Sequence, residues 1–573
     1  MAQADSSAGA RRTIVTSALP YINGVKHLGN LVGSLLPADV YTRFLRQRAE
    51  DVVYICGTDE HGTPAELSAQ AEGLPVREYC DKYWRIQKDI YERFSIEFDF
   101  FGRTSAPETH EETQQVFIEL HQRGFVVERE MEQLYCEDDA RYLPDRFVHG
   151  ECPQCGSPDA RGDQCENCGK LLDPGDLVNP RCHADPAHRL AVRVEKHLFL
   201  DLPALQDKVA AWLDTKQHWP TTTLGIARGF LKEGLQERCI TRSLEWGVAV
   251  PLRGYEDKVF YVWFDAPMGY IGITRQWAAQ VKGSSEAWRP YWFEADTRLV
   301  QFMGKDNVPF HTVTWPATLL GADQGFITAE IIKGFHWLQY EGGKFSTSKG
   351  RGIFSDDAIE LFPADYWRYY LLSVAPEKAD TNFTWKGFQG AVNKDLADVL
   401  GNLLSRVARF IVRYFDGRVP PVGPQGLGET ERETLATFAG HERDFGAALE
   451  ACEMAAAIRS LRAAWASGNK YLDLCEPWNL RKTDMDACGT VLNTCVHLIR
   501  RSAVLGSPVV PRLAQGILDA LGLSDLDPTQ VRSAELGEND LSGHVIPEQQ
   551  EPLVRKIEDE TIEELQQRFV GGG

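Results

Sequence analysis

The sequence predicts a multidomain α/β protein: a doubly wound, Rossmann-type parallel sheet, interrupted by a metal-binding insertion and followed by an all-helical bundle. Three observations support this fold class. From residue 13, apolar strand-like runs alternate with helical patterns. A stretch rich in Gly, Pro, Cys and Asp then breaks the alternation. Beyond residue 390, apolar residues recur at helical spacing.

The element pattern predicts where these parts begin and end. We expect strands over 13–19, 52–56, 259–264 and 299–303, and a helix from His27 through Arg48. The resulting segments are a disordered tail over 1–12, the two halves of the α/β domain over 13–125 and 231–325, the insertion over 126–230, a connecting region over 326–390, the bundle over 391–525 and a poorly ordered acidic tail over 526–573 that ends in a short helix.

Composition limits the class of protein further. With 573 residues, 43% of them hydrophobic and 25% charged, the chain is too long for one core and typical of soluble proteins. No apolar run is long enough to span a bilayer and no signal peptide is apparent, so we expect a cytoplasmic protein without membrane contact. The net charge of −21 excludes a generally basic coat, and any RNA contact must be a local patch.

A phosphate site is predicted near the N-terminus. His27-Leu28-Gly29-Asn30 follows the first strand and a Pro/Asn/Gly loop, and it opens a helix whose free N–H groups and dipole favour an anion. A distant Ser/Lys-rich loop, Lys344 to Lys349, could hold further phosphates. Because no Walker-type motif is present, a nucleotide would be bound at the strand ends.

Other strand ends carry candidate ligand-binding residues, each with a plainer alternative. Asp59 could receive an ammonium group or cap the following helix. Gly304 and Asp306 could bind ribose hydroxyls or form a turn and a cap. The aromatic run 259–270 would usually be core, yet its end resembles a strand leaving the sheet into a turn, which would place its last aromatic residues at the ligand edge.

Two Cys-x-x-Cys knuckles predict one structural zinc. Cys152, Cys155, Cys165 and Cys168 supply four thiolates, and a closed tetrahedral shell leaves no position for substrate. The alternative is reduced surface cysteines that share a spacing by chance. A weaker pattern surrounds the knuckles: Cys136, Asp139, Cys182 and Asp185, with His183 adjacent. It could be a degraded second site, but unrelated polar loop residues explain it more readily.

Several motifs resemble those of the methionyl-tRNA synthetases, a family of class I aminoacyl-tRNA synthetases. They are the first signature with the preceding Ser17–Tyr21, the blocks Gly57–Gly62 and Gly304–His311, Tyr261–Trp263 with Asp265–Pro267, and the second signature Lys344–Lys349. The resemblance covers residues 13 to about 525. It implies activation of methionine with Mg·ATP to methionyl-adenylate, transfer to the 3′ end of methionine tRNA, and a tRNA-stem contact by 326–390.

The same resemblance implies roles for individual residues. The methionine pocket would comprise Leu19, Tyr21, Asp59, Trp263, Ala266, Pro267, Tyr270 and His311. ATP would be bound by Gly29, Gly304, Asp306, Lys344, Ser346 and Thr347, with His27, Asn30, Lys344 and Lys349 acting in catalysis. Asn402, Arg406 and Trp478 match the residues that read the anticodon; without the resemblance, a core Trp and a solvated Arg would be the simpler interpretation.

The chain departs from the family pattern at two positions. Asn30 replaces the second His of the first signature, and Thr347 replaces the second Lys of the second signature. Two other functions therefore stay open: a synthetase for another apolar amino acid, and a synthetase-like tRNA-binding protein without ligase activity. The lack of a large editing insertion argues against leucine, isoleucine and valine. We expect a monomer.

Overall fold

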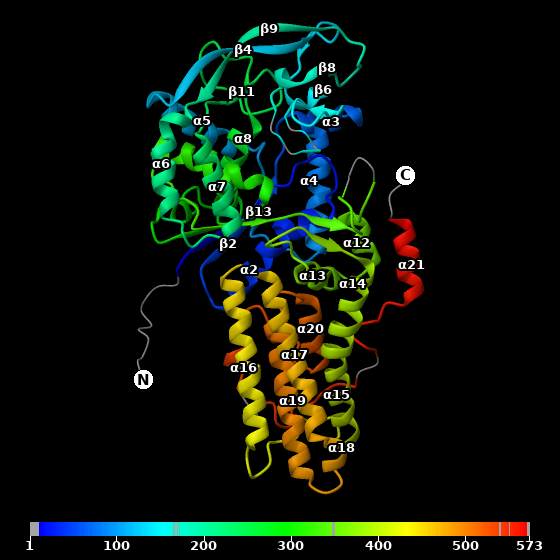
Figure 1. Cartoon of the computed structure of the whole chain (residues 1–573). Coiled ribbons are helices and arrows are strands. Elements are labelled where there is room, and N and C mark those ends of the chain that lie inside the picture. The colour runs from blue at the N-terminus through cyan, green and yellow to red at the C-terminus, as the bar shows by residue number, and fades with distance from the viewer. Residues whose placement is uncertain are drawn as a thin grey trace.

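The computed structural model of the protein describes residues 11–163, 165, 167–168, 170, 172–345, 350–537, 540–548 and 551–569. At its centre lies a five-stranded, fully parallel sheet in the order β14-β13-β1-β2-β3 (Figure 1). The strands are β1 (Thr13–Ser17), β2 (Val52–Thr58), β3 (Phe100–Arg103), β13 (Arg298–Gly304) and β14 (Ile331–Phe335). The expected disordered tail, 1–12, falls outside the described residues except for its last two.

Both faces of the sheet are covered, as expected of a doubly wound fold. Neighbouring residues of β1 point to opposite sides, so Ile14 and Val15 belong to different hydrophobic clusters. One face packs against α2 (Leu36–Gln47), α4 (Val76–Arg93) and α13 (Ala364–Ser373). The other face packs against α5 (Pro107–Gln122), α9 (Gly269–Gln280) and α11 (Trp315–Ala322). The predicted fold class is confirmed.

The helix expected from His27 to Arg48 is present as three consecutive helical segments. α1 (Leu28–Asn30) continues through a π-helical turn, η1 (Leu31–Leu35), into α2. The π-helical turn changes the helix winding next to the nucleotide signature, and such turns are frequent at functional sites.

The insertion consists of small antiparallel sheets. β4 (Val126–Cys136) pairs with β9 (Leu190–Leu200), and β6 (Val148–Glu151) lies between β7 (Ala160–Arg161) and β8 (Val178–Cys182). The expected C-terminal boundary at residue 230 stays a prediction. Leu205 of α6 (Leu202–Asp214) and Leu224 of α7 (Thr221–Glu233) are buried in the same cluster as the central sheet and the end of β9, so both helices pack beside the sheet.

The aromatic run expected as a strand over 259–264 is mostly helical. β12 (Val259–Phe260) is followed directly by α8 (Val262–Asp265), a 3-10 turn over Ala266–Met268, and α9. β12 pairs with β11 (Thr241–Arg242), outside the central sheet. The apolar composition did predict burial, but burial alone does not distinguish a strand from a short helix.

The connecting region 326–390 lies between the sheet and the bundle. Besides β14 and α13, it contains β15 (Leu338–Tyr340), β16 (Thr381–Phe383), α12 (Ser355–Leu361) and α14 (Trp385–Gly390). The bundle follows with η7 (Ala391–Gly401), α15 (Asn402–Tyr414), α16 (Glu429–Glu450), α17 (Met454–Cys475), α18 (Pro477–Leu480), α19 (Met485–Gly506) and α20 (Pro511–Ala520). Its long helices run away from the sheet and give the molecule an elongated shape (Figure 1).

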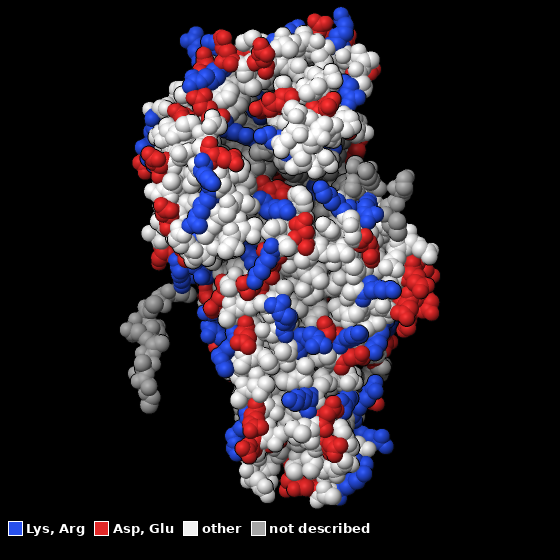
Figure 2. Space-filling view, viewed as in Figure 1, with Lys and Arg blue, Asp and Glu red and all other residues white. Residues whose placement is uncertain are grey.

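The C-terminal segment differs from the expected poorly ordered tail. The expected short helix is present as α21 (Asp559–Arg568), but Ile546, Val554 and Ile557 are buried in the cluster that contains the bundle. These apolar residues are widely spaced among acidic residues and prolines, so average composition hides them. Acidic side chains gather on the outer surface of α21, while elsewhere on this face the two signs of charge are interspersed (Figure 2).

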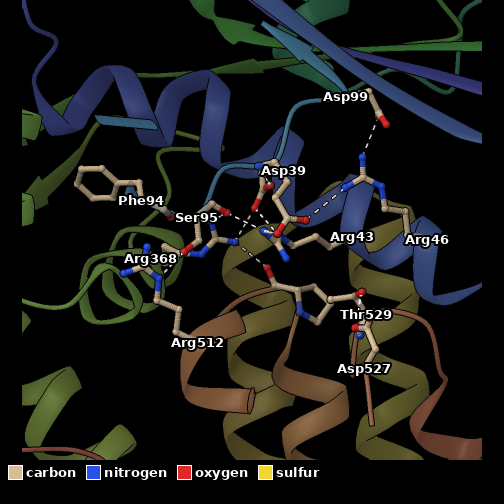
Figure 3. A network of polar contacts seen from close by, with 12 residues as sticks. Asp39, Arg43, Arg46, Phe94, Ser95, Asp99, Arg368, Arg512, Asp527 and Thr529 are labelled. Carbon is tan, nitrogen blue, oxygen red and sulfur yellow. Dashed lines mark hydrogen bonds and ion pairs between the residues drawn. The ribbon is translucent and has the colours of Figure 1, made fainter. Parts of the chain in front are cut away.

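A buried ionic network joins α2, which continues from the first signature, to the bundle (Figure 3). The Asp39 carboxylate on α2 accepts hydrogen bonds from Arg43 at 2.9 Å and from Arg368 of α13 at 2.6 Å. Arg368 also donates to the carbonyls of Pro508 and Val509 between α19 and α20. Although burial opposes ionisation, the two guanidinium groups hold the pKa of Asp39 below its usual range. This network fixes α2 against the bundle.

Among the helices that the structure describes, none is both long and apolar enough to cross a membrane.

Candidate functional site

A pocket of about 620 Å³ lies where β1 and β13 end, between the two halves of the sheet. In doubly wound sheets this is the position where ligands bind. The predicted site residues that line it are Leu19, Tyr21, His27, Gly29, Asn30, Asp59, Trp263, Ala266, Pro267, Tyr270, Gly304, Asp306, His311 and Lys344. The structure therefore brings together residues from both signatures and from the three motif blocks between them.

The first signature forms a reciprocal cap at the start of α1. The Gly29 N–H donates to Nδ1 of His27 at 3.1 Å, and the His27 N–H donates to the Asn30 side chain at 3.2 Å. Burial and the neighbouring Lys26 lower the pKa of His27 to about 4, so the imidazole is neutral at pH 7. Because Nδ1 is an acceptor, Nε2 carries the proton and is a hydrogen-bond donor.

Asp59 directly follows β2 and lines the pocket. Its main chain is fixed by hydrogen bonds to Pro20 and Ile22, yet its buried Oδ1 atom has no partner among the described residues. Burial and the nearby Asp265 raise the pKa of Asp59 well above its usual value. A buried carboxylate oxygen without a partner is costly unless a ligand supplies a charge or a donor.

Aromatic rings form the apolar wall of the pocket. Trp263 stacks on Phe310 with 3.7 Å between ring centroids, and the Tyr21 ring meets Trp263 edge-on. His311 donates from Nδ1 to the Asn307 carbonyl at 2.8 Å, so Nε2 accepts the hydrogen bond from the Tyr270 hydroxyl. Burial lowers the pKa of His311 to about 4. The wall is thus uncharged and polarizable.

Gly304 is the last residue of β13, and Asp306 lies in the 3-10 turn Lys305–Asn307 that follows; both line the pocket. A Cβ placed on Gly304 would meet no atom within 4 Å, so the pocket is open directly beside this backbone. The Trp337 indole N–H donates to the Asp306 carboxylate at 3.1 Å. This open backbone and oriented carboxylate suit a ribose.

Only the beginning of the second signature can be described. Lys344 lines the pocket, and the Phe345 ring stacks on His27 with 4.6 Å between centroids. Ser346, Thr347 and Lys349 lie outside the described residues. The His27–Phe345 stack nevertheless joins the two signatures.

The four knuckle cysteines converge on one point. Their Sγ atoms all lie within 4.8 Å of one another, with 3.9 Å between Cys152 and Cys168 and 3.6 Å between Cys155 and Cys165. Four thiolates around a tetrahedral zinc with bonds of about 2.3 Å would be about 3.8 Å apart, so the residues fit this ion. Cys165 and Cys168 also line the pocket, so the knuckle forms part of its wall.

The weaker cysteine pattern also forms a cluster, but not with the expected fourth member. Cys136, Asp139 and Cys182 are joined by His188, whose Nδ1 lies 3.2 Å from Asp139 and 3.5 Å from the Cys136 sulfur. Asp185 instead accepts a hydrogen bond from the Ala187 N–H. Spacing favoured Asp185 because it repeats the knuckle pattern, whereas the folded loop brings in His188.

Comparison with known proteins agrees with this arrangement. The family model described as tRNA synthetases class I (M) matches residues 13–408, and the anticodon binding domain of methionyl tRNA ligase matches residues 419–573. The chain belongs to the methionyl-tRNA synthetase family. Members of this class I aminoacyl-tRNA synthetase family are methionine–tRNA ligases, so the chain is an enzyme that activates methionine with ATP and transfers it to tRNA.

Individual relatives match over nearly the whole chain. Methionine–tRNA ligase 1 of Acaryochloris marina is 48% identical, with 98% of this chain and all of the relative covered. A methionine–tRNA ligase of Cereibacter sphaeroides is also 48% identical, covering 98% of this chain and 99% of the relative. The Mycobacterium tuberculosis methionyl-tRNA synthetase in complex with methionyl-adenylate superposes with a TM-score of 0.78 at 27% identity, covering 95% and 99% of the two chains.

The anticodon residues implied by the family lie on two neighbouring helices. The Arg406 guanidinium on α15 lies 5.5 Å from the ring centroid of Trp478 on α18, and Arg406 pairs with Asp473. Trp478 is 36% exposed, so it is not a core residue. Asn402 is exposed one turn before Arg406. The helices that carry these residues, α15 and α18, lie in the part of the bundle that points away from the sheet (Figure 1).

Sequence reasoning missed several pocket residues. Trp337 and Lys26 line the pocket. Phe310 lies behind the lining as the stacking partner of Trp263; it belongs to a recognised motif but was not assigned a role. A signal existed for Trp337, because it follows a strand that ends at the ligand edge. Asn167 in the knuckle lines the pocket too, and only the fold reveals that the insertion reaches it.

Proposed function

We propose that this pocket carries out both steps of the ligase reaction, with positioning and charge stabilisation in place of a side-chain nucleophile. The methionine carboxylate attacks the α-phosphate of Mg·ATP in line, and the terminal ribose hydroxyl of methionine tRNA then takes the methionyl group. The observation that carries the proposal is Asp59: a buried carboxylate with an unpartnered oxygen in the same pocket as an uncharged aromatic wall.

In this assignment Asp59 binds the methionine ammonium group. The ion pair forms in a desolvated site, where it is stronger than in water. Leu19, Tyr21, Trp263, Ala266, Pro267, Tyr270 and His311 surround the side chain; the stacked Trp263 and the fixed Tyr270–His311 pair support a wall of defined shape.

The deamino analogue of methionine, 4-(methylthio)butanoate, tests the Asp59 assignment. The unmodified enzyme should activate methionine at least about 100-fold more efficiently than this analogue, because a site built to pair with a charge rejects a ligand that lacks it. Asp59→Asn should reduce that ratio. An unchanged ratio in methionine-dependent pyrophosphate exchange would remove Asp59 from the site.

ATP would lie along the first signature and the end of β13. The His27 Nε2–H, Asn30 and the backbone at Gly29 would face the phosphates, while Gly304 and Asp306 would bind the ribose. Lys344 and Lys349, with Ser346 and Thr347 in the same loop, would stabilise the charge of the departing pyrophosphate.

Because Thr347 replaces the second lysine of the signature, Lys349 is the residue to test as a substitute for that charge. If Lys349 provides the charge that the missing second lysine would supply, Lys349→Ala should slow adenylate formation by roughly tenfold or more, as for other preorganised charge stabilisers. An unchanged single-turnover rate would show that Lys349 does not contact the phosphates.

We propose zinc at the four-cysteine cluster, where it would hold the knuckle in shape beside the pocket. The Cys136, Asp139, Cys182 and His188 cluster offers two sulfurs, one nitrogen and one oxygen within 4.8 Å of one another, which is also a donor set for zinc. Magnesium would enter with ATP, as part of the substrate.

For tRNA, Arg406 and Asn402 would contact base edges and Trp478 would stack on an unpaired anticodon base. We further propose that the enzyme acts as a monomer in the cytoplasm. All thirteen cysteines are free, which fits a reducing compartment. Sedimentation of the purified protein at its mass of 64.3 kDa tests the monomer.

A further inference from the structure

Trp337 is an exposed tryptophan at the pocket, between β14 and β15. It retains 41% exposure and is one of the pocket-lining residues. An indole of this size is usually buried unless it serves a ligand or a partner. The family motifs identified in the sequence do not include it.

The main chain of Trp337 is fixed. Its N–H donates to the Asp380 carboxylate at 3.0 Å, and its carbonyl accepts from the Thr381 N–H at 3.1 Å. The residue is thus joined to the start of β16, and the indole projects from an anchored backbone.

The indole N–H of Trp337 donates a hydrogen bond to the carboxylate of Asp306. Nε1 of Trp337 lies 3.1 Å from Oδ1 and 3.4 Å from Oδ2 of Asp306. Within the described part of the chain, Trp337 is the one side chain that donates a hydrogen bond to this carboxylate. Because an indole has one donor and a carboxylate has about four acceptor positions, the remaining lone pairs of Asp306 stay available to a ligand.

The ring of Trp337 also lies beside two ammonium groups. Lys305 Nζ is 4.0 Å and Lys344 Nζ is 5.2 Å from the ring centroid. Cation–π attraction holds such groups near the ring. Lys305 is further fixed by Asp380 at 3.1 Å. Trp337 therefore contacts the three charged residues Lys305, Asp306 and Lys344.

We propose that Trp337 is a positioning residue for the nucleotide: its indole N–H fixes the Asp306 carboxylate in the orientation that accepts hydrogen bonds from the ribose hydroxyls of ATP. This inference rests on the proposed role of Asp306 in binding ribose. An exposed carboxylate that is already oriented loses less conformational freedom on binding than one free to rotate. Losing the N–H should therefore weaken recognition of the hydroxyls specifically.

The test compares ATP with 2′-deoxy-ATP and 3′-deoxy-ATP in methionine-dependent pyrophosphate exchange. Trp337→Phe keeps an aromatic ring but removes the N–H. It should lower kcat/KM for ATP by about tenfold and that for the deoxy analogue lacking the contacted hydroxyl by less than about twofold, because the lost interaction involves that hydroxyl. KM for methionine should stay unchanged.

Trp212→Phe is the matched control. The Trp212 indole N–H donates to Thr328 at 2.8 Å outside the pocket, so its removal should leave the ratio of ATP to deoxy-ATP efficiency unchanged. In an Asp306→Asn background, Trp337→Phe should have little additional effect, because residues that act as a unit are not additive. The ratio of two nucleotides on one sample is independent of the fraction of folded enzyme.

The outcomes separate two failures. If the unmodified enzyme uses ATP and both deoxy analogues equally well, the ribose role of Asp306 in the proposed function is wrong. If the enzyme prefers ATP and Trp337→Phe retains the full preference, Trp337 does not position Asp306. If Trp337→Phe impairs ATP and both deoxy analogues equally, the ring matters through packing or the lysines, and the inference is likewise overturned.

Discussion

The Tyr270 hydroxyl and Nε2 of His311 are joined by a buried hydrogen bond of 2.9 Å, and its direction is fixed because His311 donates from Nδ1 to the Asn307 carbonyl. His311 therefore accepts from Tyr270 and stays neutral, with its pKa lowered to about 4 by burial. No charge from this pair enters the part of the pocket assigned to the thioether.

Tyr270→Phe should accordingly weaken methionine use without affecting ATP. It leaves the His311 imidazole without its hydrogen-bond donor, so the ring is no longer held in one orientation and the pocket wall loses its defined shape; kcat/KM for methionine should fall roughly tenfold. Tyr369→Phe is the control, because it removes a hydroxyl on α13 that donates a hydrogen bond to Asp395 of η7, away from the pocket. Equal effects of the two substitutions on methionine kinetics would show that Tyr270 acts only through stability.

Asp59→Asn should make the protein more stable while damaging its function. Burial and Asp265 raise the folded-state pKa of Asp59 above its unfolded value, so the folded protein holds the proton more tightly. Stability contributed by this group is full below the unfolded pKa and falls as pH rises towards the folded pKa. Asparagine removes that loss, and the free energy of unfolding at neutral pH should rise by about 1 kcal/mol.

Urea denaturation at several pH values measures this effect. The stability gain of Asp59→Asn should shrink as the pH is lowered towards the ordinary aspartate pKa. The Asp59 carboxyl is then protonated in the folded protein and increasingly in the unfolded chain as well. Asp257→Asn, at an exposed position, should give no such pH-dependent gain. If Asp59→Asn destabilised the protein at neutral pH, Asp59 would not be a buried carboxylate that lacks a partner until a ligand binds.

Metal analysis should find two zinc ions per chain in protein purified without chelators. Cys155→Ser should lose one, with local unfolding of the knuckle, and His188→Ala should lose the other. Asp185→Ala is the matched control, because Asp185 lies outside the cluster and caps a turn instead. One zinc that survives His188→Ala would restrict metal binding to the four cysteines; no zinc would exclude both sites.

Trp478→Ala should separate tRNA charging from adenylate formation. Stacking of an unpaired base on an indole is worth about 1–3 kcal/mol, so aminoacylation efficiency should fall roughly tenfold while pyrophosphate exchange is retained. Phe230→Ala removes an exposed aromatic side chain on α7, away from the bundle, and should leave both activities intact. Equal loss of both activities in Trp478→Ala would indicate a structural role.

The sequence predicted the parts of this molecule that depend on local patterns. Short apolar runs identified β1, β2 and β13, and parallel strands with intervening helices bring their carboxyl ends to one edge, so the motifs that contain His27, Asp59 and Asp306 were expected at that edge. The resemblance to synthetases supplied the pocket's aromatic residues. The central sheet and the main pocket were therefore within reach of sequence reasoning.

What the sequence did not predict depends on long-range packing. His188 joins the second cluster because a loop returns to Cys136, and no local spacing encodes that return. The helices α6 and α7 pack in the cluster of the central sheet through Leu205 and Leu224, a contact that local spacing does not encode. Similarly, Ile546 and Ile557 anchor a segment whose composition resembles a tail. In each case tertiary contacts override local composition.

The central claim is that the pocket formed by Asp59, Trp263 and Tyr270 activates methionine. Pyrophosphate exchange measured separately with each of the twenty amino acids tests it most directly. We predict robust exchange with methionine, and efficiencies for the other apolar amino acids lower by at least about 100-fold, since pocket shape and the thioether decide specificity. Robust exchange with leucine or cysteine but not with methionine, or no exchange with any amino acid, would contradict the account.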